Sequence, residues 1–406
     1  MSNKEKIDVF KKNTMDGYPF VYIHGLFGWG AQEGIDKVVP YWGATSCHLM
    51  KELNDLGYES YAVSIGSMSS NWDRVCELYA ALTGTRVDYG VAHSKSHNHA
   101  RYGRDYEKPL VEGWGEKDKD GKIKKLNLVG HSFGGVTART LAYLLEFGSK
   151  AEQEATDPDD ISPLFTGGKK GLINSIVTIC APHDGTTLAY FFEHTHTVKF
   201  CETLCFGYAG IMGRTALNGF VDFHLEQFDL SAVPKKYKHP KTSFKDSFKN
   251  VMAIKDKAMD DLYPDGAKAI NDEIGILDDV YYFSYAYDTS RKSYFGDFYV
   301  PKAATNPGLR IFSRSMGHFK ENDVTDYPVD STWLPNDGMV SVVSALHPSD
   351  EPYQAYNPSD VKKGIWNVMP VRHGDHGTAI GLFKSKEYTV DFYIGINNMV
   401  NALGKN

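Results

Sequence analysis

The chain has 406 residues, of which 42% are hydrophobic and 23% are charged. This composition supplies a buried core and excludes disordered, collagenous and low-complexity proteins. The chain holds 44 basic and 51 acidic residues, so its formal charge is −7, and without a long basic run we expect no nucleic-acid partner. The five cysteines are too few, and odd in number, for a disulfide scaffold.

The apolar runs bear on localisation. Met1–Lys6 is polar, and no run approaches the ~20 apolar residues that a membrane span needs. We therefore expect no stable membrane anchoring. Two interpretations stay open: a cytoplasmic protein, or a mature protein whose signal peptide is not part of this sequence.

Short apolar runs alternate with amphipathic stretches along the first half of the chain. Apolar runs bounded by turns predict strands, and the stretches between them predict helices. This alternation is typical of βαβ units and predicts a mainly parallel sheet flanked by helices. The expected strands are Tyr18–Ile23, Ser60–Ile65, Leu126–Val129, Leu172–Cys180 and Tyr281–Tyr287, and the expected helices are His48–Leu56, Trp72–Leu82, Val136–Phe147 and Val390–Leu403.

The middle of the chain, about Tyr190–Lys249, carries no obvious strand pattern. Its apolar segment, residues 198–213, is interrupted by Gly207, Gly210 and Gly213. One interpretation is a helical insertion packed on the core, because apolar helical stripes are usually core. The other is a mobile cap over an apolar cleft, in which the glycines act as hinges.

A possible nucleophile follows the third expected strand. Leu126–Val129 runs into Gly130-His131-Ser132-Phe133-Gly134-Gly135 and then into a helical pattern. A serine on such a strand–turn–helix bend needs small neighbours, because larger side chains would collide where the backbone turns sharply. The alternative is a structural glycine-rich turn. The strand and helix on either side favour Ser132 as a catalytic nucleophile.

A serine nucleophile needs a base, and the base needs an orienting acid. In α/β-hydrolases the chain order is serine, acid, histidine. Asp337 in Asn336-Asp337-Gly338 is the candidate acid, although an ordinary Asp-Gly turn would look the same. His376 is the candidate base because Asp375 and Gly377 flank it before the last helix, and His373 is its rival.

The same chemistry needs donors for the tetrahedral oxyanion. We expect two backbone N–H groups in this role. One belongs to Phe133, directly after the nucleophile, and the other to Leu26 in His24-Gly25-Leu26-Phe27-Gly28 after the first strand. Since His24 and His131 flank these donors, we interpret both as structural residues near the site.

A possible metal site lies between the second strand and the nucleophile. Asp73 precedes three clustered histidines, His93, His97 and His99. Imidazole and carboxylate together suit Zn²⁺, and four protein ligands would close the site against water. Spacing alone leaves a second interpretation open, which is a solvated polar loop.

Taken together, the chain resembles the zinc-containing lipases of thermophilic bacilli and, more distantly, the staphylococcal lipases. The resemblance spans most of the chain. Its segments are His24–Gly30, Ser69–Glu77, Val87–Gly90, His99–Arg104, Gly130–Gly135, Ala181–Thr187, Asn336–Gly338 and Asp375-His376.

This resemblance implies one α/β-hydrolase domain over residues 1–406, with a zinc-binding insertion at 67–110 and a lid at 190–260. It implies the triad Ser132, Asp337 and His376, with Leu26 and Phe133 as oxyanion donors. It further implies one structural zinc per chain, and the ligands that it assigns are Asp73, His93, His99 and Asp256, with Asp260 and Asp261 as alternatives to the last.

Calcium is not expected. The family's calcium ligands include carboxylates shortly after the catalytic histidine, and the corresponding places here hold Thr378 and Phe383, which cannot serve. The lid region resembles little, so acyl-chain preference does not transfer. The resemblance also implies a secreted enzyme, with a cytoplasmic one as the alternative.

The implied activity is hydrolysis of lipidic or other apolar esters through an acyl-enzyme, and the apolar segment 198–213 extends this expectation to bulky or polymeric aliphatic esters. Two alternatives stay open. One is a non-catalytic α/β-hydrolase that serves as a binding module, and the other is acyl transfer by the same triad. The partner is a small-molecule or interfacial ester, and the oligomeric state is open.

Overall fold

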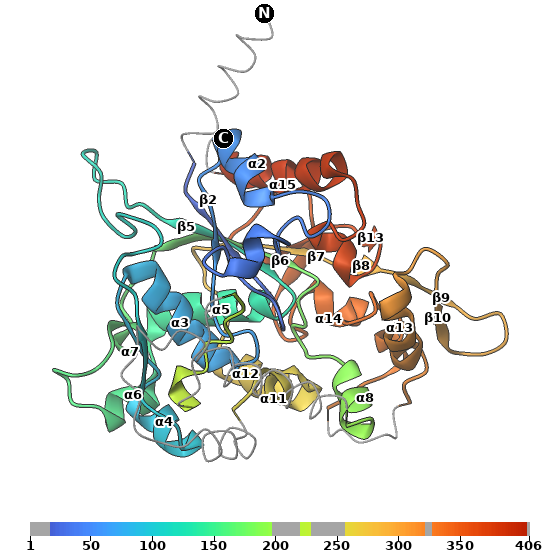
Figure 1. Ribbon diagram of the computed structural model, residues 1–406, viewed down its shortest axis with the longest axis horizontal. Helices are drawn as coiled ribbons and strands as arrows, with labels where there is room; N and C mark the ends of the chain where they lie inside the picture. The colour runs from blue at the N-terminus through green and yellow to red at the C-terminus, as the bar shows by residue number, and fades with distance from the viewer. Residues whose placement is uncertain (1–16, 197–219, 229–255, 321–326, 404–406) are drawn as a thin grey trace, which may run out of the picture.

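The computed structural model describes residues 17–196, 220–228, 256–320 and 327–403 (Figure 1). Its centre is a seven-stranded sheet in the order β11-β12-β7-β6-β5-β1-β2, and all neighbouring strands in it are parallel. The strands are β1 (Phe20–Ile23), β2 (Ser60–Val63), β5 (Leu126–His131), β6 (Ile173–Ile179), β7 (Tyr281–Tyr285), β11 (Tyr353–Ala355) and β12 (Trp366–Val368).

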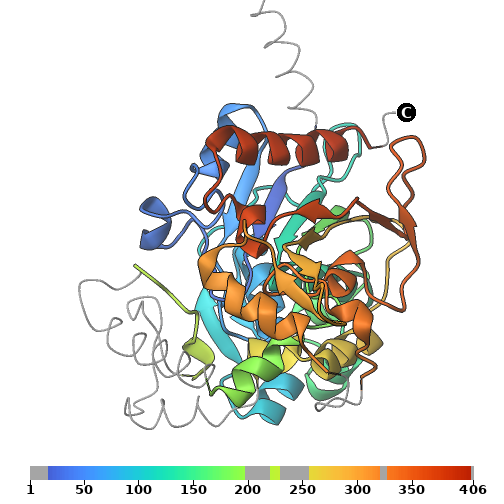
Figure 2. The same cartoon turned by 90° about the vertical axis from the view of Figure 1, so that its right-hand side faces the viewer.

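Helices cover both faces of this sheet (Figure 1). Successive side chains of a strand point to opposite faces, so Phe20 and Tyr22 of β1 join one apolar core while Val21 and Ile23 join the other. Figure 2 shows α15 lying across one side of the sheet, where it packs with α2. The opposite face carries α3 and α5. These helices span Leu49–Asp55 (α2), Asn71–Thr83 (α3), Phe133–Phe147 (α5) and Lys386–Asn401 (α15).

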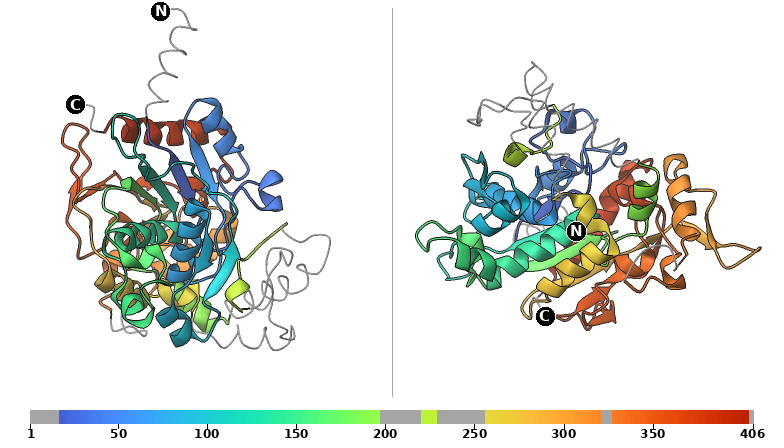
Figure 3. Two further views of the ribbon diagram at one scale, coloured as in Figure 1. Left: turned by 90° about the vertical axis from the view of Figure 1, so that its left-hand side faces the viewer. Right: turned by 90° about the horizontal axis from the view of Figure 1, so that it is seen from below.

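Shorter elements surround this framework. Seen from below in Figure 3, α12 lies beside α5, and the side chains of α11 and α12 pack against the start of α5. Three two-stranded sheets pair β3 with β4, β9 with β10 and β8 with β13. The remaining α-helices are α4 (Val91–His97), α6 (Lys150–Ala155), α7 (Pro163–Thr166), α8 (Leu188–His194), α11 (Ala258–Leu262), α12 (Pro264–Glu273), α13 (Arg310–Gly317) and α14 (Val342–Leu346), and the remaining strands are β3 (Arg86–Asp88), β4 (Tyr102–Asp105), β8 (Tyr287–Asp288), β9 (Ser290–Lys292), β10 (Tyr299–Pro301) and β13 (Arg372–His373).

The predicted parallel sheet with flanking helices is confirmed, and the boundaries shift for local reasons. Helix α15 begins at Lys386, earlier than expected, because the Ser385 side chain accepts a hydrogen bond from the Tyr388 N–H and caps the helix. The strand expected at Tyr281–Tyr287 is divided after Tyr285, because the following residues leave the main sheet and pair with β13.

The apolar segment 198–213, which carries the lid prediction, lies outside the described residues. Within the part of the chain that the structure describes, no helix combines the length and apolar character that crossing a bilayer requires.

Candidate active site and metal-ligand group

Ser132 occupies the sharp bend between strand β5 and helix α5. Its backbone φ is 55° and ψ is −133°, a conformation that L-residues rarely adopt. The bend is tight: a β-carbon at Gly130 would lie 2.5 Å from the backbone of Gly134. Small residues are therefore required here, as the sequence predicts, and the bend places the serine at the carboxyl end of the sheet.

Asp337 and His376 meet beyond the ends of the strands. The Nδ1 atom of His376 lies 2.8 Å from Oδ2 of Asp337, and the backbone N–H of His376 donates to the Asp337 carbonyl at 2.9 Å. The other carboxylate oxygen, Oδ1, accepts from the N–H groups of Met339 and Val340, both at 2.8 Å. The carboxylate is thus held on every side, and Nδ1 of the imidazole faces it as the hydrogen-bond donor.

His376 also lies beside the nucleophile bend. Its ring centroid is 4.6 Å from that of His131, the residue that precedes Ser132. Ser132 and His376 each keep 9% of their surface exposed, so the two are nearly buried but reachable. The rival base His373 lies on the exposed strand β13, and its backbone pairs with Asp288.

The loop that carries Leu26 passes against the nucleophile. A β-carbon at Gly25 would lie 2.6 Å from Cβ of Ser132 and 3.1 Å from its Oγ. Phe133 is the first residue of α5, so its N–H belongs to the helix turn whose donors have no intrahelical acceptor. The backbones of Leu26 and Phe133 therefore approach the serine from two sides.

Arg74 contacts the backbone of the loop that carries Leu26, and the sequence does not predict this role. Its guanidinium is fully buried and donates to the carbonyl of His24 and to that of Gly66, each at 2.5 Å. Nε of Arg74 donates to Oγ1 of Thr137 at 3.1 Å. Burial lowers the pKa of Arg74 to about 10, so the side chain stays charged at neutral pH. The sequence shows only a charged residue in the expected helix Trp72–Leu82, because the burial of Arg74 depends on the fold.

The four residues that the resemblance assigns to zinc converge in the structure. Asp73 lies on α3, His93 on α4, His99 after α4 and Asp256 before α11, and one ligand atom from each lies within 4.8 Å of the others. Nε2 of His93 is 3.3 Å from Asp73 and 3.0 Å from Asp256. Histidine and carboxylate side chains at these distances can hold a metal ion.

The hydrogen bonding of this group fits the binding of a cation. Oδ1 of Asp73 and Nε2 of His99 are buried without a hydrogen-bond partner, although Nε2 of His99 is 3.1 Å from an oxygen of Asp256. Burial, and then the neighbouring Asp256, raise the pKa of Asp73. Unpaired acceptors facing one another are costly in a protein interior, and a shared divalent ion would pair them.

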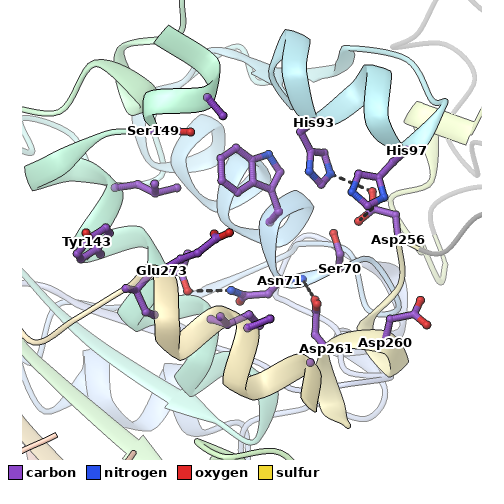
Figure 4. A pocket seen from close by; sticks show the side chains of 18 of the residues that line it. Ser70, Asn71, His93, His97, Tyr143, Ser149, Asp256, Asp260, Asp261 and Glu273 are labelled. Atoms are coloured by element: carbon purple, nitrogen blue, oxygen red, sulfur yellow. Dashed lines mark hydrogen bonds and ion pairs between the residues drawn. The ribbon is translucent and has the colours of Figure 1, made fainter. Parts of the chain in front are cut away.

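A cavity of about 690 Å³ borders the group, and Figure 4 shows His93, His97 and Asp256 along its edge. Nδ1 of His97 is 4.0 Å from Asp256, farther than the other two histidines. Asp261 instead accepts a hydrogen bond from the Asn71 N–H at 2.6 Å. Among the possible fourth ligands, Asp256 is therefore the one that the structure brings to the group.

A second set of possible metal ligands, His131, Cys180 and His376, overlaps the candidate active site. Burial, and then the nearby Asp337, raise the pKa of the Cys180 thiol. A neutral thiol is a poor metal ligand. We therefore assign this set to the serine site.

The fold and the serine site together indicate a class of protein. A parallel α/β sheet carries a serine on a strained strand–helix bend, with a histidine–aspartate pair beside it. Residues 16–402 match the family model described as "Lipase-like, C-terminal domain". The chain belongs to this lipase family.

Relatives and solved structures agree with this assignment. Lipase 2 of Staphylococcus aureus is 32% identical over 98% of this chain, which matches 56% of that protein. The chain thus spans about half the length of the curated relatives. The structure of Staphylococcus hyicus lipase (TM-score 0.80, 29% identity) covers 97% of this chain and 98% of its own. Lipase 1 from Pelosinus fermentans (TM-score 0.77, 36% identity) covers 96% and 100%. The expected staphylococcal resemblance is confirmed, while the one to thermophilic bacilli stays a prediction.

Proposed function

We propose that this protein is a serine carboxylic-ester hydrolase that cleaves lipidic or other apolar esters through an acyl-enzyme. The observation that carries the proposal is the Asp337–His376 pair, 2.8 Å apart, beside the bend that holds Ser132. Membership of the lipase family supports the choice of an ester as substrate.

In the proposed reaction, Oγ of Ser132 attacks the acyl carbonyl while His376 takes the hydroxyl proton. Asp337 holds the imidazole with its proton on Nδ1 and stabilises the cation that forms. His376 then gives the proton to the leaving alcohol, and the acyl group stays on Ser132. Water activated by His376 releases the acid and restores the serine.

The backbone N–H groups of Leu26 and Phe133 are the proposed oxyanion donors. Each such donor typically contributes ~10²–10³ in rate. Gly25 supports this role because only a residue without a side chain lets the Leu26 loop approach Ser132 so closely. Arg74, bound to the His24 carbonyl, fixes the loop from the other side.

Asp73, His93, His99 and Asp256 are the proposed ligands of one structural zinc. The convergence of the four side chains and the unpaired atoms of Asp73 and His99 support this site. When bound, the metal neutralises the two carboxylates and ties α3, α4 and the segment before α11 together. Asp73, His93, His99 and Asp256 would leave no open position for a nucleophilic water, so the role of the ion would be structural.

The finer predictions rest on the sequence resemblance. They are a single domain with insertions at 67–110 and 190–260, a lid in the second insertion, and secretion. Acceptance of bulky aliphatic polyesters is a separate prediction, which rests on the apolar segment 198–213. Hydrolysis and acyl transfer to an alcohol share every residue named above. Analysis of the products formed in water with an added alcohol separates the two.

Ser132→Ala tests the proposal. The variant and the wild type are compared on a soluble p-nitrophenyl ester, on emulsified triacylglycerol and by fluorophosphonate labelling. We expect kcat to fall by on the order of 10⁶ and labelling to disappear, because the triad acts as a unit. Ser175→Ala is the matched control: Ser175 is buried on β6 and bonds to Asn127, so its loss should leave kcat and labelling unchanged. A Ser132→Ala variant with wild-type rate contradicts the function, and an unreactive wild type favours the non-catalytic binding module.

A further inference from the structure

A chain of buried hydrogen bonds links the Gly25 loop to the backbone of His376. The Gly25 N–H donates to the Tyr41 hydroxyl at 2.9 Å. That hydroxyl lies 2.7 Å from Nδ1 of His131, and Nε2 of His131 lies 3.2 Å from the carbonyl oxygen of His376. All four residues expose less than a tenth of their surface. Water therefore does not compete for these bonds.

The hydrogen-bond partners of Tyr41 and His131 determine where the hydrogens of these two side chains lie. The Tyr41 oxygen accepts from Gly25, so its own hydrogen points to Nδ1 of His131, and Nε2 then carries the ring proton and donates to the carbonyl of His376. The opposite tautomer would face a nitrogen lone pair toward that carbonyl oxygen, leaving two buried acceptors unpaired. Burial, and then the nearby His376, lower the pKa of His131, so its ring is neutral and has a single proton to place.

The contact with His131 completes the restraint of His376. Asp337 fixes the backbone N–H and the ring Nδ1 of His376, and His131 fixes its carbonyl oxygen. At the other end, Gly25 directly precedes Leu26. These hydrogen bonds thus connect His376, which moves the proton, to the Leu26 loop, which faces the oxyanion.

We propose that Tyr41 and His131 are positioning residues that set the placement of His376 relative to the Leu26 loop. Both act through other residues, since Tyr41 touches the loop backbone and His131 the His376 backbone. The inference rests on the proposed function and deepens it. Positioning of this kind affects kcat more than KM, because small displacements of catalytic groups cost up to about 10² in rate.

Tyr41→Phe is the sharpest test because it removes only the hydroxyl. The ring contacts with Trp29 (5.7 Å) and Trp42 (5.5 Å) remain. On a soluble ester we expect kcat to fall about 10- to 100-fold while KM stays within about twofold. His131→Leu should give a loss of similar size. The double variant should lose little more than either single one, because both break the same chain.

Tyr22→Phe is the matched control. Tyr22 is also fully buried and also contacts Trp42, at 5.1 Å, but its hydroxyl donates to Asn397 on α15, away from the serine site. If the loss of a buried tyrosine hydroxyl acts only on stability, the melting temperature should fall in both Tyr41→Phe and Tyr22→Phe. We expect kcat to stay within about twofold in Tyr22→Phe.

His131→Gln provides the rescue. The glutamine amide can donate where Nε2 of histidine donates, so kcat should recover several-fold relative to His131→Leu. The proposal is overturned if Tyr41→Phe keeps wild-type kcat, if Tyr41→Phe and Tyr22→Phe change kcat alike, or if the losses of Tyr41→Phe and His131→Leu add in the double variant. Failure of the proposed function itself is distinct, since the wild type would then not label with fluorophosphonate.

Discussion

Two clusters of histidine and aspartate lie in this molecule, and they differ in how their polar atoms are paired. At Asp337, one oxygen accepts two backbone N–H groups and the other meets His376. At Asp73, one buried oxygen has no hydrogen-bond partner, and neither does Nε2 of His99. In the first cluster, both oxygens of Asp337 have hydrogen-bond donors. The second leaves two buried atoms that the proposed cation would pair.

From this difference we expect the Asp337 cluster to serve catalysis and the Asp73 cluster to serve stability. A carboxylate that is fully hydrogen-bonded orients an imidazole and needs no further ligand. In the second cluster Gln227 donates to Oδ2 of Asp73 at 2.7 Å, but Oδ1 has no hydrogen bond, and an unpaired carboxylate oxygen is costly in a protein interior unless a metal pairs it. Changes at Asp337 should therefore act on rate, while changes at Asp73 or Asp256 should act on folding.

Among changes at these two clusters, the largest expected effect comes from Asp337→Asn. An amide in this place offers an N–H where Nδ1 of His376 needs an acceptor, so the imidazole takes the wrong tautomer. We expect kcat to fall by about 10⁴ on a soluble ester, with little change in the melting temperature.

The neighbouring Asp375→Asn is the control. Asp375 caps the short helix at His376 by accepting from the Thr378 N–H at 3.0 Å, and an amide oxygen can do the same. The variant loses the bond from the Asn306 N–H to the other oxygen, which does not involve His376. Its kcat should stay within a few-fold of the wild type. A large loss of kcat in Asp375→Asn with no loss in Asp337→Asn would show that Asp337 is not the acid.

Metal removal is expected to give the next largest effect, and on stability. Protein purified without chelator should contain about one zinc per chain, as expected of a closed four-ligand site. At a free metal concentration of about 1,000 times Kd, binding stabilises the folded state by about 4 kcal/mol, so chelation should lower the melting temperature strongly. The rate on a soluble ester at low temperature should change last.

His93→Ala and His97→Ala make this test specific. His93 contacts both carboxylates, whereas His97 lies 4.0 Å from Asp256. Zinc content should fall in His93→Ala and stay near one per chain in His97→Ala. Protein without zinc, or equal loss in the two variants, would reject the site.

Asp184 extends the comparison to a third buried carboxyl, which accepts hydrogen bonds and has the positive charge of Arg139 nearby. Its oxygens accept from Asn271 at 3.0 Å and Ser349 at 3.1 Å, yet burial raises its pKa to about 6. The folded state holds this proton more tightly than the unfolded chain, whose pKa is about 4. The resulting stability is full below pH ~4 and is lost as the pH rises through about 6.

Asp184→Asn should remove that dependence. Between pH 4 and 7 the free energy of unfolding of the wild type should fall relative to this variant by roughly 2 kcal/mol. Denaturant unfolding at several pH values measures the difference, and the exposed Asp159→Asn is the control. Parallel pH profiles for the wild type and Asp184→Asn would contradict the prediction.

The sequence predicts those parts of the fold whose signals are local. Strands β1, β5 and β6 are apolar runs bounded by turns, and the glycines around Ser132 mark a bend that only small residues allow. Strands β11 and β12 are three residues each and carry no period, so nothing in the sequence separates them from a loop. Their place in the sheet depends on pairing with β7.

The same distinction applies to the candidate site. Ser132 has a local signature, and Asp337 and His376 follow from the chain order of the hydrolase class. Tyr41 has neither: it lies in a loop, 90 residues from the histidine that it contacts. Only the fold brings the two together. Asp256 likewise lies 163 residues from His93, so its assignment came from family resemblance.

The backbone conformation of Ser132 has a consequence for natural variation. At a φ of 55° the serine occupies a region that glycine enters without penalty and other residues only at a cost of about 1–3 kcal/mol. Selection for thermal robustness alone would drive this position to glycine. A lineage that abandoned turnover but kept the scaffold would thus be recognisable by the residue at the apex of this bend, and its proteins should melt at a higher temperature than their active ancestors.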